Sequence, residues 1–197
     1  MKASYRRLLA PMLLSVLAIS GQLAGQDAPK PKKVLTLDQQ EYQSKFQNYL
    51  AQRRALQQRA AKAFNAESSR DKAGDCKNAN NTRDIEICLQ KESEITAKNY
   101  SSFTEAIRDL LRLAPPESHQ PPTSGPTGTP LDAEASTKEF DNLQTAWQQY
   151  RKIGTATAYD QYKGGTAAPV FSMEADQELM RAHMRELNFI YDGLLHR

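Results

Sequence analysis

Histidine, cysteine and the short motifs of catalysis are scarce in this sequence. It contains three histidines and two cysteines among 197 residues, and the histidines do not have the spacing of metal ligands. No glycine-rich phosphate loop or nucleophile elbow is present, and Gly164-Gly165 lacks the other glycines of a nucleotide-binding fingerprint. Three histidines do not exclude a Ser/His/Asp arrangement, but no pattern indicates one. The sequence therefore predicts a protein that is not an enzyme, without catalytic residues, metal or cofactor.

Patterns typical of β-strands are missing as well. Apolar residues recur instead at every third or fourth position, which places them on one face of an α-helix. We expect helices to begin near Asp38, Thr82, Asp132 and Ser172, with Asp38, Thr82 and Ser172 as N-caps. Residues 114–130 are rich in proline and glycine, so they cannot hold a regular element. The sequence predicts an all-α protein, an antiparallel bundle of about four helices with this Pro-rich linker between the helix pairs.

The first 25 residues have the composition of a secretory signal peptide. Three basic residues precede an apolar stretch, 8–19, and small residues follow it. The apolar stretch is shorter than the roughly 20 residues that a membrane-spanning helix needs, so cleavage is favoured over anchoring. We expect export to the periplasm or secretion, without stable insertion in the membrane once residues 1–25 are removed.

Removal of the signal peptide changes the charge of the chain. The whole chain has 26 basic and 23 acidic side chains, and residues 1–25 hold three of the bases and none of the acids. The remaining protein is neutral overall, which gives no reason to expect nucleic acid as a partner. Residues 38–70 have six bases and three acids, whereas 71–118 and 131–197 together have 14 bases and 19 acids. We expect a mildly acidic body with a basic N-terminal helix.

Residues 26–70 are predicted to form an extended leader and this basic amphipathic helix, ahead of a helical domain over 71–197. The apolar stripe of the helix consists of Tyr42, Phe46, Tyr49, Leu56, Ala60 and Ala63. Arg53 occupies one step of the stripe, which is narrow. Two interpretations are open: the helix lies against the body, or it is a coiled-coil arm that makes the protein a homo-oligomer.

The two cysteines, Cys76 and Cys88, lie close together in the sequence. In an exported protein such a pair is typical of one disulfide, whereas a zinc site would need further ligands. In one continuous helix their Cα atoms would be about 18 Å apart, beyond the roughly 4.4–6.8 Å that a disulfide needs. The turn-forming residues 74–81 are therefore expected to reverse the chain between two helices.

The third predicted helix carries the single tryptophan. Phe140, Leu143, Trp147 and Tyr150 recur at three- and four-residue spacing, so we expect Trp147 and Tyr150 to anchor the core. Arg151 lies one step off this stripe, where its guanidinium can reach a carboxylate at the edge of the core.

A loop is predicted over residues 159–171, which contain two adjacent glycines and a proline. This loop has two interpretations. It is either a simple connection between helices, or a projection that presents a partner-binding loop to a cleft. The candidate partner-binding residues are Tyr162, Lys163, Gly164 and Gly165.

Four features occur together in a fixed order. Thr82 and Glu86 lie between two cysteines that are twelve positions apart, and a predicted helix carries the motif Trp147-x-x-Tyr150-Arg151. A Gly-Gly loop and a leucine-containing last helix follow. These features resemble the LprI-type lysozyme inhibitor family of Cys-rich helical domains in bacterial envelope proteins. The resemblance covers about residues 76–195.

The resemblance implies an exported, non-enzymatic binding protein that inhibits lysozyme in the bacterial envelope. A basic lysozyme would then be the partner, and a mildly acidic body would attract it. The family's second cysteine pair is replaced here by Thr155 and Ala175, so no bridge closes the base of the Gly-Gly loop. The alternative is a structural or chaperone-like periplasmic helical protein that self-associates through its N-terminal amphipathic helix.

Overall fold

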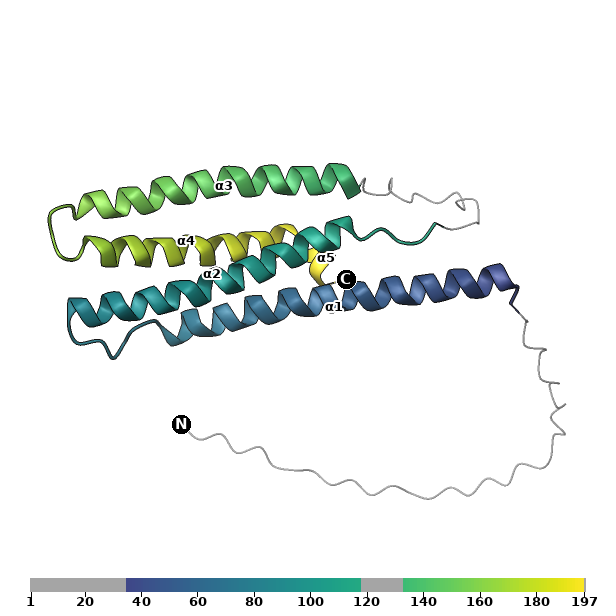
Figure 1. The fold of residues 1–197 in the computed structure, drawn as a ribbon, viewed down its shortest axis with the longest axis horizontal. Coiled ribbons are helices and arrows are strands. Elements are labelled where there is room, and N and C mark those ends of the chain that lie inside the picture. Colours follow the sequence, from purple (N-terminus) through teal and green to yellow (C-terminus); the bar gives the residue numbers. More distant parts are fainter. Residues whose placement is uncertain (1–34, 118–132, 197) are drawn as a thin grey trace, which may run out of the picture. The chain divides into compact units, whose positions relative to one another are not determined.

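Five helices account for most of the residues that the computed structural model describes, which are 35–117 and 133–196 (Figure 1). They are α1 (Leu37–Ala73), α2 (Thr82–Arg112), α3 (Ala133–Gln161), α4 (Ala168–Ile190) and the short α5 (Asp192–His196). The described residues contain no strand, which confirms the expected all-α bundle. The predicted signal peptide and residues 118–130 of the predicted linker lie outside the described residues.

The expected N-caps of the first two helices are wrong, because each helix is capped by a residue slightly earlier in the chain, and the helices begin at Leu37 and Thr82. Thr36 caps α1: its hydroxyl accepts from the backbone N–H of Gln39, whose side chain accepts from the Thr36 N–H in return. Asn81 caps α2 by accepting from the N–H of Asp84. These pairs satisfy backbone donors that the first helical turn leaves open.

The predicted start of the last long helix at Ser172 is wrong. α4 begins at Ala168, with Pro169 in its first turn, where a missing N–H costs no helical hydrogen bond. Ser172 lies inside the helix, and its hydroxyl donates to the Thr155 carbonyl of α3. Since α3 continues to Gln161, the connection is only 162–167 rather than 159–171.

α2 and α4 lie side by side in the middle of the bundle, with α1 packed on one side and α3 on the other. Pairs of contacts show that α1 and α2 are antiparallel, since Arg59 binds Asp109 while Arg70 binds Glu92. α3 and α4 form a second antiparallel pair. No contact joins α1 to α3 among the described residues. The fold is therefore two helical hairpins that dock through α2 and α4.

The predicted boundary between residues 70 and 71 is wrong, because α1 belongs to the same compact unit as the rest of the described residues from Thr36 onward. Ala60 and Ala63 of α1 are buried in the common core. Arg59 donates to Glu105 and Asp109 of α2. Part of the acidic excess of the later helices thus neutralises the basic helix α1 inside the same fold.

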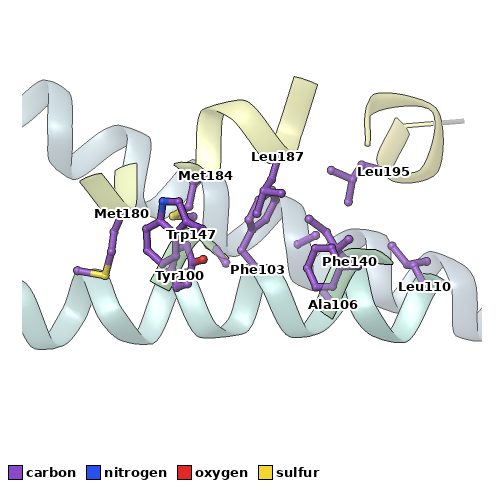
Figure 2. Close-up of a cluster of buried hydrophobic side chains, with 13 residues drawn as sticks. Tyr100, Phe103, Ala106, Leu110, Phe140, Trp147, Met180, Met184, Leu187 and Leu195 are labelled. Atoms are coloured by element: carbon purple, nitrogen blue, oxygen red, sulfur yellow. The ribbon is translucent and has the colours of Figure 1, made fainter. Parts of the chain in front are cut away.

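The core runs along the bundle and receives side chains from all five helices (Figure 2). Phe103, Ile107, Met180 and Leu187 are fully buried between α2 and α4. Phe140 of α3 packs edge-on against Tyr191, with ring centroids 5.6 Å apart. This continuous apolar contact fixes the two hairpins against each other and so positions the polar groups at their surfaces.

Candidate partner-binding site

The turn between α1 and α2 is closed by the predicted disulfide. Cys76 and Cys88 are bonded, and their Cα atoms are 5.8 Å apart. Gly74 ends α1 with a φ of 75°, which a residue without a side chain adopts easily. The chain therefore reverses between the two cysteines, as predicted from the distance that one continuous helix would put between their Cα atoms.

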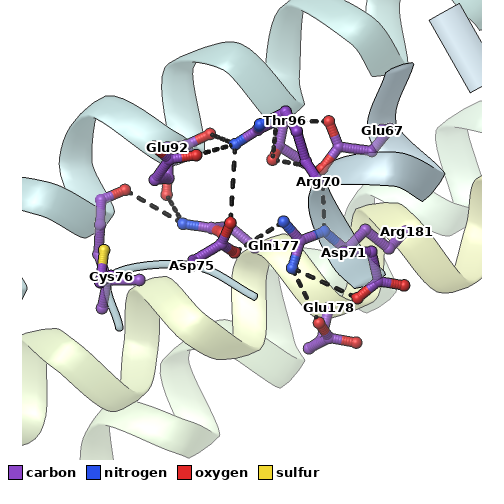
Figure 3. Close-up of polar contacts among 12 residues, drawn as sticks. Glu67, Arg70, Asp71, Asp75, Cys76, Glu92, Thr96, Gln177, Glu178 and Arg181 are labelled. Carbon is purple, nitrogen blue, oxygen red and sulfur yellow. Dashed lines mark hydrogen bonds and ion pairs between the residues drawn. The ribbon is translucent and has the colours of Figure 1, made fainter. Parts of the chain in front are cut away.

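Arg181 of α4 lies beside this turn and is surrounded by carboxylates (Figure 3). Its guanidinium donates to Glu67 of α1 at 2.9 Å and to Asp75 of the turn at 2.7 Å. Arg181 is 5% exposed and Glu67 only 2%. Burial alone would lower the pKa of Arg181, but its hydrogen bonds to Glu67 and Asp75 outweigh burial and raise that pKa.

The buried carboxylate of Glu67 is kept ionised by its neighbours. Thr96 and Asn99 of α2 each donate to it at 2.8 Å. Burial alone would raise the pKa of Glu67, but hydrogen bonds from Asn99, Arg181 and Thr96 and the charge of Arg70 hold it below the usual value. Glu67 therefore does not lie on a solvated face of α1. This ion cluster connects α1, α2 and α4 and has a structural role.

Trp147 is buried, as predicted, and stacks between rings of α2 and α4. The His183 ring lies 4.4 Å from it and the Tyr100 ring 4.7 Å, measured between centroids. The Tyr100 hydroxyl donates to Gln144 Oε1, and Gln144 Nε2 lies 3.3 Å from His183 Nε2. Because an amide nitrogen only donates, His183 Nε2 is the acceptor. The ring proton is then on Nδ1, 3.0 Å from Glu186.

The prediction that Tyr150 anchors the core is wrong, because its side chain is 62% exposed. The buried positions of α3 are Thr137, Phe140, Gln144 and Trp147. The same three- and four-residue spacing continues to Arg151 and not to Tyr150. Tyr150 therefore lies on the outer side of α3.

Arg151 binds a carboxylate at the edge of the core, as predicted. It donates to both oxygens of Asp176 on α4 at 2.6 Å, and its guanidinium carbon lies 5.7 Å from the centre of the Trp147 ring. The Thr155 hydroxyl lies 3.3 Å from the same carboxylate, which follows Ala175 in the chain. Thr155 and the neighbour of Ala175 thus lie where an ion pair joins α3 to α4.

The four candidate residues after α3 form a tight turn rather than a long projecting loop. The Tyr162 ring stacks on Phe171 of α4 at 3.6 Å between centroids. The Gly165 N–H donates to the Tyr162 carbonyl at 3.0 Å, and Gly164 has a φ of 92° that favours glycine. Tyr162, Lys163, Gly164 and Gly165 nevertheless remain exposed, so the turn is accessible to a partner.

A groove follows one face of α3 towards this turn. Its outer part is an open cavity of about 580 Å³ between α3 and the start of α4, which includes Tyr159, Thr155 and Asp176 in its wall. Its inner part is a cavity of about 330 Å³ between α2 and α3. Gln148 and Arg151 line both cavities. We call these two adjoining cavities together the α3 groove.

Sequence reasoning missed the α3 groove, because most residues in its wall are of polar types, even where their apolar side-chain atoms form the surface, and the periodicity of apolar residues does not reveal them. From Phe140 to Tyr159 the α3 groove follows about 28 Å of helix. Tyr159 is 43% exposed and offers an aromatic face beside the Arg151–Asp176 ion pair. Convergent polar groups around an open, partly apolar hollow are typical of binding sites.

Other kinds of site find no support in residues 35–117 and 133–196. No group of three or more histidine, cysteine or acidic side chains there could hold a metal ion. None of the helices in that part of the chain has the length and apolarity needed to cross a membrane.

Comparisons with known proteins do not assign this chain to a family. No family model, no curated protein and no solved structure matches it.

Proposed function

We propose that the protein is an exported binding protein that inhibits a basic lysozyme through the α3 groove and the adjoining turn 162–165. Three observations support this proposal. The N-terminal 25 residues have the composition of a signal peptide, the ordered motifs resemble those of LprI-type inhibitors, and an open groove lies beside the Gly-Gly turn. The groove is the observation that carries the proposal.

The α3 groove has the chemistry of a surface that recognises another protein. Tyr159 supplies a rigid aromatic contact at a low entropy cost, as aromatic side chains do in interfaces. The Arg151–Asp176 pair is fixed by two hydrogen bonds, so it is preorganised for polar contacts. Lys163 and Tyr162 lie in the turn at the end of the groove and extend the same surface.

Long-range electrostatics favour a cationic partner. Residues 71–118 and 131–197 have 19 acids against 14 bases, and the six bases and three acids of residues 38–70 in the same fold reduce this excess to two acids. The remaining attraction to a basic protein is weak and acts mainly at the acidic parts of the surface. The Debye length is about 8 Å at 0.15 M salt, so association should slow as salt rises. Ala60 and Ala63 of α1 are part of the core, so removal of the basic helix would unfold the bundle. Lysozyme binding is therefore tested with point substitutions and not with a deletion of α1.

The experiment is a cell-wall lysis assay with lysozyme and increasing amounts of the purified protein. Tyr159→Ala should weaken inhibition at least about tenfold, since central aromatic contacts dominate interface energies. Tyr150→Ala is the matched control: Tyr150 is an exposed tyrosine of the same helix, nine residues away, and therefore on the opposite face of α3. Unslowed lysis at a large molar excess in low salt would refute the proposal, and equal effects of the two substitutions would refute the site.

A further inference from the structure

The N-terminal half of α1 carries an aromatic stripe outside the bundle core. All buried residues of α1 lie at Ala60 or later. Tyr42, Phe46 and Tyr49 are half-buried, and their rings stack along the helix with centroids 6.0 Å apart in each step. This stripe continues in sequence into Leu56 and Ala60, which do pack against the core. We call residues 37–55 the α1 arm.

One end of the stripe borders an acidic cavity of about 360 Å³. Tyr42 forms part of its wall, together with Asp38 of the first turn of α1 and Glu117 after α2. Glu41 and Lys45 also line the cavity and pair with each other at 2.8 Å. An aromatic ring between carboxylates is the environment that a guanidinium prefers.

A guanidinium occupies the other end of the same stripe. Arg53 continues the spacing of Tyr42, Phe46 and Tyr49, and its side chain is partly exposed. It has no ion-pair partner among the residues that the structure describes. Its own arm cannot bring it to the acidic cavity, since Tyr42 lies about 16 Å earlier along the helix.

We propose that a second copy of the chain occupies this surface, with the two α1 arms antiparallel. The two-fold axis passes between Phe46 and Tyr49, which is also midway between Tyr42 and Arg53 in sequence. Each Arg53 then enters the acidic cavity beside Tyr42 and Asp38 of the other copy. The interface is isologous, because every contact occurs twice.

Charge selects this orientation over the parallel one. The α1 arm begins with two acids, Asp38 and Glu41, and its stripe ends with the base Arg53. Antiparallel arms bring acids against bases at both ends, whereas parallel arms would place Arg53 against Arg53. In Figure 1 α1 begins at one end of the bundle, and α3 turns into α4 at the other end, where Tyr159 and Ser172 line the outer cavity of the α3 groove. Dimerisation and lysozyme binding are therefore separable.

The test measures self-association of the purified, natively processed protein by sedimentation equilibrium. The wild type should be in monomer–dimer equilibrium. Arg53→Glu should weaken dimerisation at least about tenfold, since it places two like charges in each cavity. Arg54→Glu is the matched control, because it makes the same charge change one residue away and off the stripe. Thermal unfolding should be unchanged in both variants, as the core excludes these residues.

The double variant Asp38→Arg/Arg53→Glu distinguishes the orientations. It should restore dimerisation that each single substitution weakens, because antiparallel arms again oppose unlike charges, whereas parallel arms would still oppose like charges. A wild type that stays monomeric at the highest attainable concentration overturns the proposal. Equal dimerisation of the Arg53→Glu and Arg54→Glu variants overturns it too, and a double variant no better than Arg53→Glu overturns the antiparallel register.

Discussion

Replacing Arg181 by methionine should destabilise the protein strongly at neutral pH. Two of the carboxylates around Arg181 are buried, with Glu67 and Asp75 side chains only 3% and 12% exposed. The other two, Asp71 and Glu178, are 35% and 57% exposed, and such pairs contribute at most about 1 kcal/mol each. Removing one partner of a buried pair leaves an uncompensated charge and costs about 3–5 kcal/mol. For a protein of this size the melting temperature should fall by roughly 6–20 °C.

Denaturant titrations at neutral and acidic pH measure this cost. Arg181 helps to keep the pKa of Glu67 low, so that pKa should rise in Arg181→Met and the penalty should shrink once Glu67 is protonated. Arg185→Met is the matched control one turn later, since the Arg185 side chain is 52% exposed and pairs with Asp71 alone. The control should lose less than about 1 kcal/mol. Equal losses in the two variants would show that the buried cluster is not held by Arg181.

Three further changes have defined outcomes. Replacing Cys76 and Cys88 by serine should cost about 3 kcal/mol in urea titrations, and mass spectrometry of the unreduced wild type should find no free thiol. Burial lowers the pKa of His183 despite Glu186, so the folded state binds fewer protons than the unfolded state. Stability should therefore fall as pH drops below about 6.5, and His183→Gln should remove that slope. Trp147→Ala should cost about 3–5 kcal/mol by thermal melting, against less than about 0.5 kcal/mol for Tyr150→Ala; the reverse order would contradict the burial pattern of α3.

The helices and the disulfide could be predicted because they depend on local signals. The apolar spacing identifies α2 and α4, and the turn-forming residues around Gly74 explain how Cys76 reaches Cys88. The first residue of a helix is harder to predict, since several neighbouring residues can serve as its N-cap. The structure uses Thr36 and Asn81, because their side chains reach backbone N–H groups that Asp38 and Thr82 do not serve.

The polar interior could not be predicted, because a sequence pattern based on apolarity assumes that polar residues face water. Gln144 and Arg181 are buried, yet each has partners from other helices that become neighbours only in the folded chain. The same assumption led to the wrong prediction that Tyr150, and not the adjacent Arg151, faces the core. The α3 groove was missed for the same reason, because the polar residues Gln144 and Arg151 form part of its wall.

The local disulfide has a consequence for the order in which the chain can fold. Cys76 and Cys88 are only twelve positions apart, so the α1–α2 hairpin can close before α3 and α4 have emerged. That hairpin cannot complete its polar end alone, because Glu67 and Asp75 receive hydrogen bonds from Arg181 of α4. In the early hairpin Arg70 is the one cation beside Glu67 and Asp75 among the described residues of α1, α2 and their turn, so these carboxylates resist full burial until α4 supplies Arg181. The last long helix therefore decides when the first hairpin becomes native, and a chain truncated before α4 should remain incompletely folded even when its disulfide has formed.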